Sequence, residues 1–108
     1  MANSCIITAA VTGASFTPTM SPHIPFKVED VVADSVAAAK AGAAIIHIHA
    51  RNAADGSPSS DPAIFAAYAA GIKAESDAII NMTTGGATGQ SIEERLNVVR
   101  VLQPELCS

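Results

Sequence analysis

Three apolar runs, each followed by a stretch with helical periodicity, constrain the fold of this chain more than any other feature. The runs occupy residues 5–11, 43–49 and 78–82, and a fourth opens near residue 105. Strand-like and helical segments that alternate in this way are typical of βαβ units, which build a parallel sheet covered by helices. The chain is therefore predicted to be an α/β protein.

The spacing of these runs distinguishes between two kinds of parallel sheet. The strands begin roughly every 33 residues, so eight units would need about 265 residues, close to the ~250 of a (β/α)8 TIM barrel. A doubly wound sheet is the alternative, but it would need a complete fourth strand, and the sequence stops at Ser108. We predict that residues 1–108 form the N-terminal part of a single TIM-barrel domain, covering three βα units and the start of the fourth strand.

Local signals place the helices between the strands. A helical pattern begins at Val28, after a loop whose prolines preclude a helix. Asp61 is the predicted N-cap of the next helix, with Pro62 at its first position. Ser91 and Glu94 have the spacing of a capping box at the start of the third helix.

Composition excludes several classes of partner. The net charge is −4 and the six Lys and Arg residues are scattered singly, so the chain offers no basic stripe to a nucleic acid or an anionic membrane. It has neither the roughly 18 consecutive apolar residues of a membrane helix nor the basic start of a secretory signal. A cytoplasmic protein is expected, with Cys5 and Cys107 as reduced thiols in buried strands.

Two histidines end the second apolar run. In a strand, side chains two residues apart share one face, so Ile45, His47, His49 and Arg51 are predicted to lie on one side and the alternate residues on the other. An unpaired polar group on a partly buried face costs roughly 1–3 kcal/mol, and a Zn²⁺ ion would account for both imidazoles together. Two core imidazoles bonded to neighbouring side chains are the alternative.

A catalytic zinc usually takes three protein ligands, and His-x-His supplies two. His23 lies in a loop and Asp55 in a turn, so we expect the third ligand beyond Ser108. Arg51 is predicted to bind either a substrate anion or an acid of the remaining barrel.

Small and glycine residues follow the third strand. Thr83, Thr84 and Gly85 precede a helix N-terminus, an arrangement that suits a carboxylate, a phosphate or a developing oxyanion, although a tight strand-to-helix turn also needs glycine. The absence of a Walker lysine and of a Gly-x-Gly-x-x-Gly motif gives nucleotide binding no support. Ser15 is interpreted as a turn hydroxyl and Tyr68 as a packing residue.

Four motifs together resemble one known family. They are Thr12-Gly13-Ala14, the proline-rich segment 17–25, the segment 41–51 that ends in His-Ile-His-Ala-Arg, and Ile80-Asn81-Met82-Thr83-Thr84-Gly85-Gly86. In combination they resemble the β-keto acid cleavage enzymes, of which 3-keto-5-aminohexanoate cleavage enzyme is the type member. The likeness covers residues 5–108, about two fifths of what such a barrel needs.

The resemblance implies an acyl-transferring, carbon–carbon bond cleaving enzyme with a divalent metal, usually zinc. Such enzymes condense a β-keto acid with acetyl-CoA and release acetoacetate and a new CoA ester. His47 and His49 match the two metal histidines; the third ligand, a glutamate, and the proton-abstracting arginine and aspartate come later in the family's chain, so this segment alone is expected to be incomplete as a catalyst.

The resemblance also implies substrate contacts. Thr83 matches a small hydroxyl near the substrate carboxylate, with Thr84 and Gly85 as backbone donors beside it. Ser15 stands where the type member has a glutamate, and a neutral hydroxyl cannot pair with a substrate ammonium. A homo-oligomer is expected. The alternatives are a zinc-dependent TIM-barrel hydrolase and a non-catalytic module that dimerises through its open sheet edges.

Overall fold

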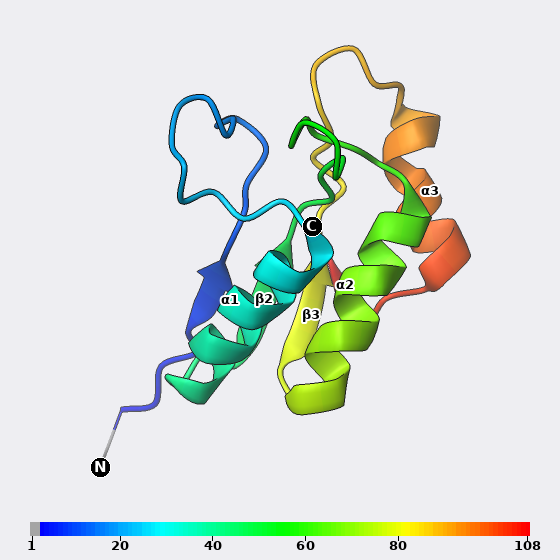
Figure 1. Ribbon diagram of the computed structural model, residues 1–108. Coiled ribbons are helices and arrows are strands. Elements are labelled where there is room, and N and C mark those ends of the chain that lie inside the picture. The colour runs from blue at the N-terminus through cyan, green and yellow to red at the C-terminus, as the bar shows by residue number, and fades with distance from the viewer. Residues whose placement is uncertain (1–2) are drawn as a thin grey trace.

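The computed structural model describes residues 3–108 as a four-stranded parallel sheet with three helices (Figure 1). Met1 and Ala2, which the predicted domain includes, lie outside the described residues. The strands are β1 (Thr8–Ala10), β2 (Ile45–Ile48), β3 (Ile79–Met82) and β4 (Leu106–Cys107). The helices that connect them are α1 (Val28–Lys40), α2 (Pro62–Glu75) and α3 (Ile92–Leu102).

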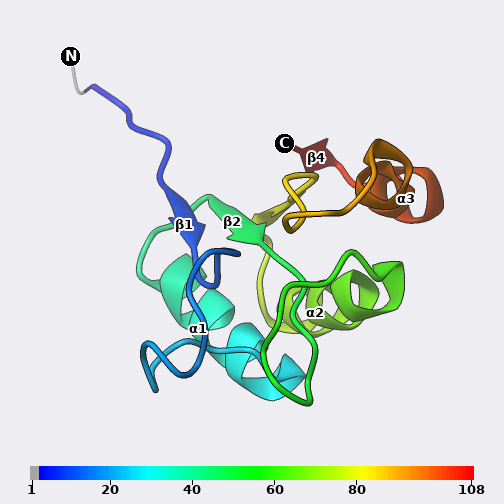
Figure 2. The ribbon, with the colours of Figure 1, turned by 90° about the horizontal axis from the view of Figure 1, so that it is seen from above.

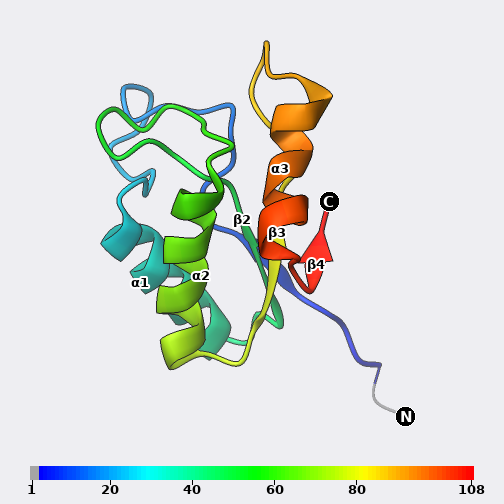
Figure 3. The same cartoon turned by 90° about the vertical axis from the view of Figure 1, so that its right-hand side faces the viewer.

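The strands lie side by side in chain order, β1-β2-β3-β4, and each neighbouring pair is parallel. When every βαβ connection has the same handedness and each new strand is added on the same side of the previous one, all the connecting helices lie on the same face of the sheet. Figure 2 shows the strands on a curve with α1, α2 and α3 outside it, and Figure 3 shows the same layering from the side. The order lacks the reversal that a doubly wound sheet requires, so the predicted α/β class is confirmed and the sheet is consistent with part of a TIM barrel.

The core lies between the sheet and the helices. Alternate strand residues point into it, and α1, α2 and α3 cover them with their apolar stripes. Fully or almost fully buried members include Ile46 and Ile48 of β2, Ile80 and Met82 of β3, Val31 of α1, Phe65, Tyr68 and Ile72 of α2, and Val98 of α3. In the described part of the chain the other face of the sheet carries no helix, and its side chains are more exposed.

The helix termini follow the local signals. The Asp61 carboxylate accepts a hydrogen bond from the Ala63 amide at 2.9 Å, and Pro62 is the first residue of α2. Ser91 and Glu94 form the predicted capping box at the start of α3. None of the three helices in the described chain has the length and apolar character that a bilayer crossing requires.

The first strand is shorter than the apolar run that predicted it. The run covers residues 5–11, but β1 is limited to Thr8–Ala10. It is an edge strand with β2 as its one partner, and its pairing with β2 begins at Thr8, opposite Ile45. The prediction that Cys5 and Cys107 are buried was wrong: both are free thiols, as expected, but exposed. Cys107 lies on β4, an edge strand that pairs with β3 on one side only, and Cys5 precedes β1, the other edge strand.

Candidate functional site

The two histidines project from the end of β2 on the face that the helices leave open. His47 lies in register between Ala10 of β1 and Asn81 of β3, and His49 follows one residue after the strand ends. Both side chains are half-buried, whereas Ile46, Ile48 and Ala50 between and beside them are buried against the helices. The alternation predicted from the sequence therefore holds from Ile45 to Ala50.

The imidazoles of His47 and His49 converge. Their Nε2 atoms are 3.0 Å apart, and the ring centroids are separated by 4.9 Å with the planes at 79°. Two nitrogen ligands of a tetrahedral zinc ion, each at 2.0–2.1 Å, are about 3.3–3.4 Å apart. The two nitrogens thus need to separate by only a few tenths of an ångström to bind one ion, and without an ion one Nε2–H donates to the other Nε2.

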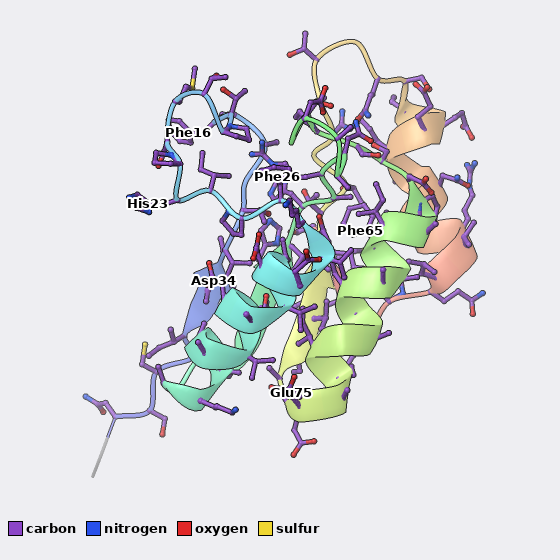
Figure 4. The ribbon with its side chains drawn as sticks, viewed as in Figure 1. Phe16, His23, Phe26, Asp34, Phe65 and Glu75 are labelled. Carbon is purple, nitrogen blue, oxygen red and sulfur yellow. The ribbon has the colours of Figure 1, made fainter. Side chains whose placement is uncertain are left out.

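Electrostatics favour the neutral form of His49. Burial first, then the His47 ring and the Arg51 cation, lower the pKa of His49 to about 4. A neutral imidazole is the form that binds a metal. The described residues 3–108 hold no cluster of three His, Cys, Asp or Glu side chains around the pair. His23, considered as a third ligand, is exposed on the outer side of the β1–α1 loop (Figure 4).

Thr12 fixes the backbone of His49. Its hydroxyl accepts a hydrogen bond from the His49 amide at 3.1 Å and donates one to the His49 carbonyl at 3.3 Å. Backbone pairing between β1 and β2 ends at His47, two residues before His49. The Thr12 side chain therefore replaces the backbone hydrogen bonds at His49, whose imidazole needs a fixed orientation to bind a metal. The sequence did not predict this role of Thr12. Its only signal was a hydroxyl immediately after the apolar run 5–11.

Arg51 departs from the predicted alternation. It was expected on the same face as the histidines, but it is 1% exposed and forms an isolated bridge with Pro58 instead of continuing β2. Its guanidinium donates hydrogen bonds to the carbonyls of Gly13, Phe16 and Gly56. The role of Arg51 toward a substrate anion or an acid of the remaining barrel stays a prediction.

The turn after β3 is closed by its own hydrogen bonds. Thr83 is buried, and its Oγ1 accepts from the Gly85 amide at 2.9 Å. The Thr84 amide donates to the Ser108 carbonyl at 2.6 Å, and the Thr84 carbonyl accepts from Arg95 Nε at 2.7 Å. The two backbone donors expected to hold a carboxylate therefore have partners within the chain, so binding through them would require these bonds to exchange.

A cleft of about 470 Å³ lies among the three loops that follow β1, β2 and β3. Its lining consists of Ala14 and Ser15 from the first loop, Pro58 from the second, and Gly86, Ala87 and Thr88 from the third. Ser15 is exposed at this cleft, whose lining within the described residues carries hydroxyls and small apolar groups but no charged side chain. Another cavity, of about 480 Å³, lies at the opposite ends of β2 and β3, where Ala43, Ala44, Ala78 and Ile79 are among its lining residues.

Gln90 is a further organising residue that sequence reasoning missed. Its Oε1 accepts hydrogen bonds from the Ser60 hydroxyl and from the Ala87 amide, both at 2.7 Å. It therefore joins the loop after β2 to the loop after β3 at the rim of the cleft. The local sequence around Gln90 could not predict this contact, because its partner Ser60 is thirty residues away.

The open face and its loops define a class of protein. Convergent imidazoles, the buried Thr83 and a polar cleft gather at the carboxyl ends of parallel strands, which is where α/β enzymes place their active sites. The comparison with known proteins narrows the class: residues 4–108 match the beta-keto acid cleavage enzymes, and this chain belongs to that family.

Individual relatives in this family are similar over nearly the whole chain. The chain is 50% identical over 103 residues to 3,5-dioxohexanoate:acetyl-CoA acetone transferase of Paraburkholderia graminis, which covers 95% of this chain and 33% of that protein. It is 44% identical to 3-keto-5-aminohexanoate cleavage enzyme of Acetoanaerobium sticklandii (95% of this chain, 37% of the relative). It is 37% identical to 3-oxoadipate:acetyl-CoA acetyltransferase of Cupriavidus necator (100% and 37%). The chain thus spans about a third of the length of these relatives.

Proposed function

We propose that this chain forms the N-terminal part of a metal-dependent enzyme that cleaves a β-keto acid with acetyl-CoA, yielding acetoacetate and a new acyl-CoA. Membership of the family supports the reaction class, and three relatives act with acetyl-CoA or on a keto acid according to their names. Family membership favours this reaction over the zinc hydrolase and the non-catalytic module that the sequence left open.

The observation that carries the proposal is the 3.0 Å approach of the two Nε2 atoms. His47 and His49 fit a divalent metal, with zinc as our choice, because both are half-buried nitrogen donors aimed at one point and His49 is held neutral. A divalent ion would supply Lewis-acid stabilisation of the charge that develops on the keto oxygen. The role of the chain's own residues is to orient this centre: Thr12 holds His49, and the walls of the cleft receive the substrate.

We further propose that the β-keto acid carries an uncharged side group. Among residues 3–108, the lining of the cleft beside Ser15 supplies no charged side chain that would pair with an ammonium or a carboxylate, and an unpaired charge there would lose its hydration without compensation. The relative with 50% identity acts, by its name, on 3,5-dioxohexanoate, whose side group is a neutral ketone.

Metal content tests the first proposal. We would measure zinc in the full-length protein by elemental analysis for the wild type and for His47→Ala, His49→Ala and His23→Ala. The wild type and His23→Ala are expected to hold about one ion per chain, and the other two variants to lose it. Retention of the metal in both His47→Ala and His49→Ala would reject the assignment.

Activity on a panel of keto acids tests the second proposal, that the β-keto acid carries an uncharged side group. With acetyl-CoA as co-substrate, kcat/KM is expected to be highest for a neutral side group and lower for ammonium and carboxylate side groups. Ser15→Glu should shift the preference towards the ammonium substrate, because it supplies the missing counter-charge. A wild type that prefers a charged side group would overturn this choice of substrate.

A further inference from the structure

Arg51 is a buried cation whose observed partners are all backbone carbonyls. Its side chain is 1% exposed, and within residues 3–108 the ion pair that the structure forms joins two other residues, Arg100 and Glu93. A guanidinium removed from water without a carboxylate is unfavourable unless its N–H groups are hydrogen-bonded. The position of Arg51 is therefore explained by the carbonyls that it binds.

Those carbonyls belong to two loops. Nε and Nη2 donate to the Gly13 carbonyl at 3.0 and 2.6 Å, and Nη1 donates to the Phe16 carbonyl at 2.5 Å, all in the β1–α1 loop. Nη1 also donates to the Gly56 carbonyl at 2.8 Å, in the loop after β2. The planar fork of an arginine can satisfy three acceptors at once, whereas a lysine offers a single ammonium.

The two loops touch where Arg51 joins them. A Cβ at Gly56 would lie 2.4 Å from Cγ of Pro18 and 3.2 Å from Cγ of Phe26, so the Pro18 and Phe26 side chains pack against the Gly56 backbone and leave no room for a side chain at this position. Tyr68, buried on α2, adds a hydrogen bond from its hydroxyl to the Phe26 carbonyl at 3.0 Å. The contact is thus close-packed, with Arg51 as its charged centre.

Arg51 does not line the cleft itself, but the segment that it holds does. The Gly13 and Phe16 carbonyls flank Ala14 and Ser15, and Gly56 lies two residues before Pro58. These residues form one wall of the cleft. Without the guanidinium, the carbonyls of both loops would turn to water and the wall would lose its fixed position.

We propose that Arg51 is a positioning residue that clamps the loops after β1 and β2 together, and so fixes the wall of the cleft formed by Ala14, Ser15 and Pro58. Its part in catalysis rests on the proposed function, whereas the clamp itself does not. The alternative, in which Arg51 contacts the substrate anion directly, predicts a different response to a lysine at this position.

Hydrogen exchange tests the clamp. The Met20 amide, bonded to the Thr17 carbonyl, reports on the first loop, and the Gly56 amide, bonded to the Asn52 carbonyl, reports on the second. In Arg51→Lys and Arg51→Met, exchange at both amides is expected to accelerate on the order of tenfold or more. Amides of the sheet, such as Ile79 and Thr83, serve as the internal reference and should keep their protection.

Arg100→Met is the matched control. Arg100 is exposed on α3 and pairs with Glu93, so its removal should leave every loop amide unchanged. If Arg51→Met fails to fold, Arg51→Lys, which retains the charge, still decides the question. Unchanged exchange at the Met20 and Gly56 amides in Arg51→Lys would overturn the clamp.

Steady-state kinetics of the full-length protein test the consequence. With metal content unchanged, both Arg51 variants should raise KM for the keto acid about tenfold or more, to similar extents, because lysine cannot reproduce the fork. Substantial rescue by lysine would instead indicate direct pairing with a substrate anion and would overturn the positioning role. If the full-length wild type cleaves no β-keto acid, the proposed function fails, but the exchange result still decides the clamp.

Discussion

The contact between Gly71 and Val32 gives a prediction whose sign depends on packing. Gly71 lies inside α2, where replacing glycine by alanine normally stabilises a helix by about 1 kcal/mol. Here, however, a Cβ would lie 2.5 Å and 3.0 Å from the two γ carbons of Val32 and 3.3 Å from its Cβ. Rotation about χ1 of valine cannot clear both γ carbons, so α1 and α2 would have to separate.

Overpacking of this kind typically costs about 1–3 kcal/mol. Set against the gain in helix propensity, Gly71→Ala is expected to lower the free energy of unfolding by up to about 2 kcal/mol. In a Val32→Ala background the γ carbons are absent, and the same substitution should then stabilise the protein by up to about 1 kcal/mol. The two sites should therefore show a coupling energy of about 1–3 kcal/mol.

Urea unfolding of the four proteins of this double-mutant cycle, followed by circular dichroism, measures that coupling. Ala70→Gly, at the adjacent exposed position of α2, calibrates the propensity term and should cost about 1 kcal/mol. If Gly71→Ala stabilises the protein equally with and without Val32, the two helices are not in close contact at this point, and the reasoning is refuted.

Two further predictions concern the histidine pair. Thr12→Val should weaken zinc binding by the full-length protein about 10–100-fold in a chelator competition, because His49 loses the hydroxyl that holds its backbone. Thr12→Ser, which keeps the hydroxyl, should retain the affinity. Equal zinc affinity in the wild type, Thr12→Val and Thr12→Ser would contradict the role of Thr12 in holding His49. In metal-free protein, the lowered pKa of His49 means that the unfolded chain takes up a proton below about pH 6.5 that the folded chain refuses until about pH 4. Stability should therefore fall as the pH drops through this window, and His49→Gln should flatten the fall; an identical pH profile in the variant would exclude His49 as its source.

The fold was largely predictable from local patterns. Apolar runs separated by helical periodicity predicted the order of strands and helices, and the caps at Asp61 and Ser91 located the starts of α2 and α3. Each of these features depends on residues within one turn or one strand of each other, so propensity and hydrogen bonding act over a short range. The edge strands were predicted less well, because their length and the exposure of Cys5 and Cys107 depend on neighbours that the local pattern does not contain.

The candidate site divides in the same way. The spacing of His47 and His49 was enough to place both imidazoles on one face, since period-two alternation is a property of the strand itself. The period-two alternation failed at Arg51, because β2 ends before this residue. The partners of its guanidinium lie in loops that only the folded chain brings together.

The sequence by itself determined the order of strands and helices, the starts of α2 and α3, and that two imidazoles share a face, because backbone geometry and hydrophobic periodicity act between near neighbours. Only the tertiary structure decided that Thr12 holds His49, that Gln90 joins two loops, and that Arg51 is buried among carbonyls. Contacts between residues thirty or more positions apart are set by how the loops pack once the sheet has formed, and no local pattern encodes that packing.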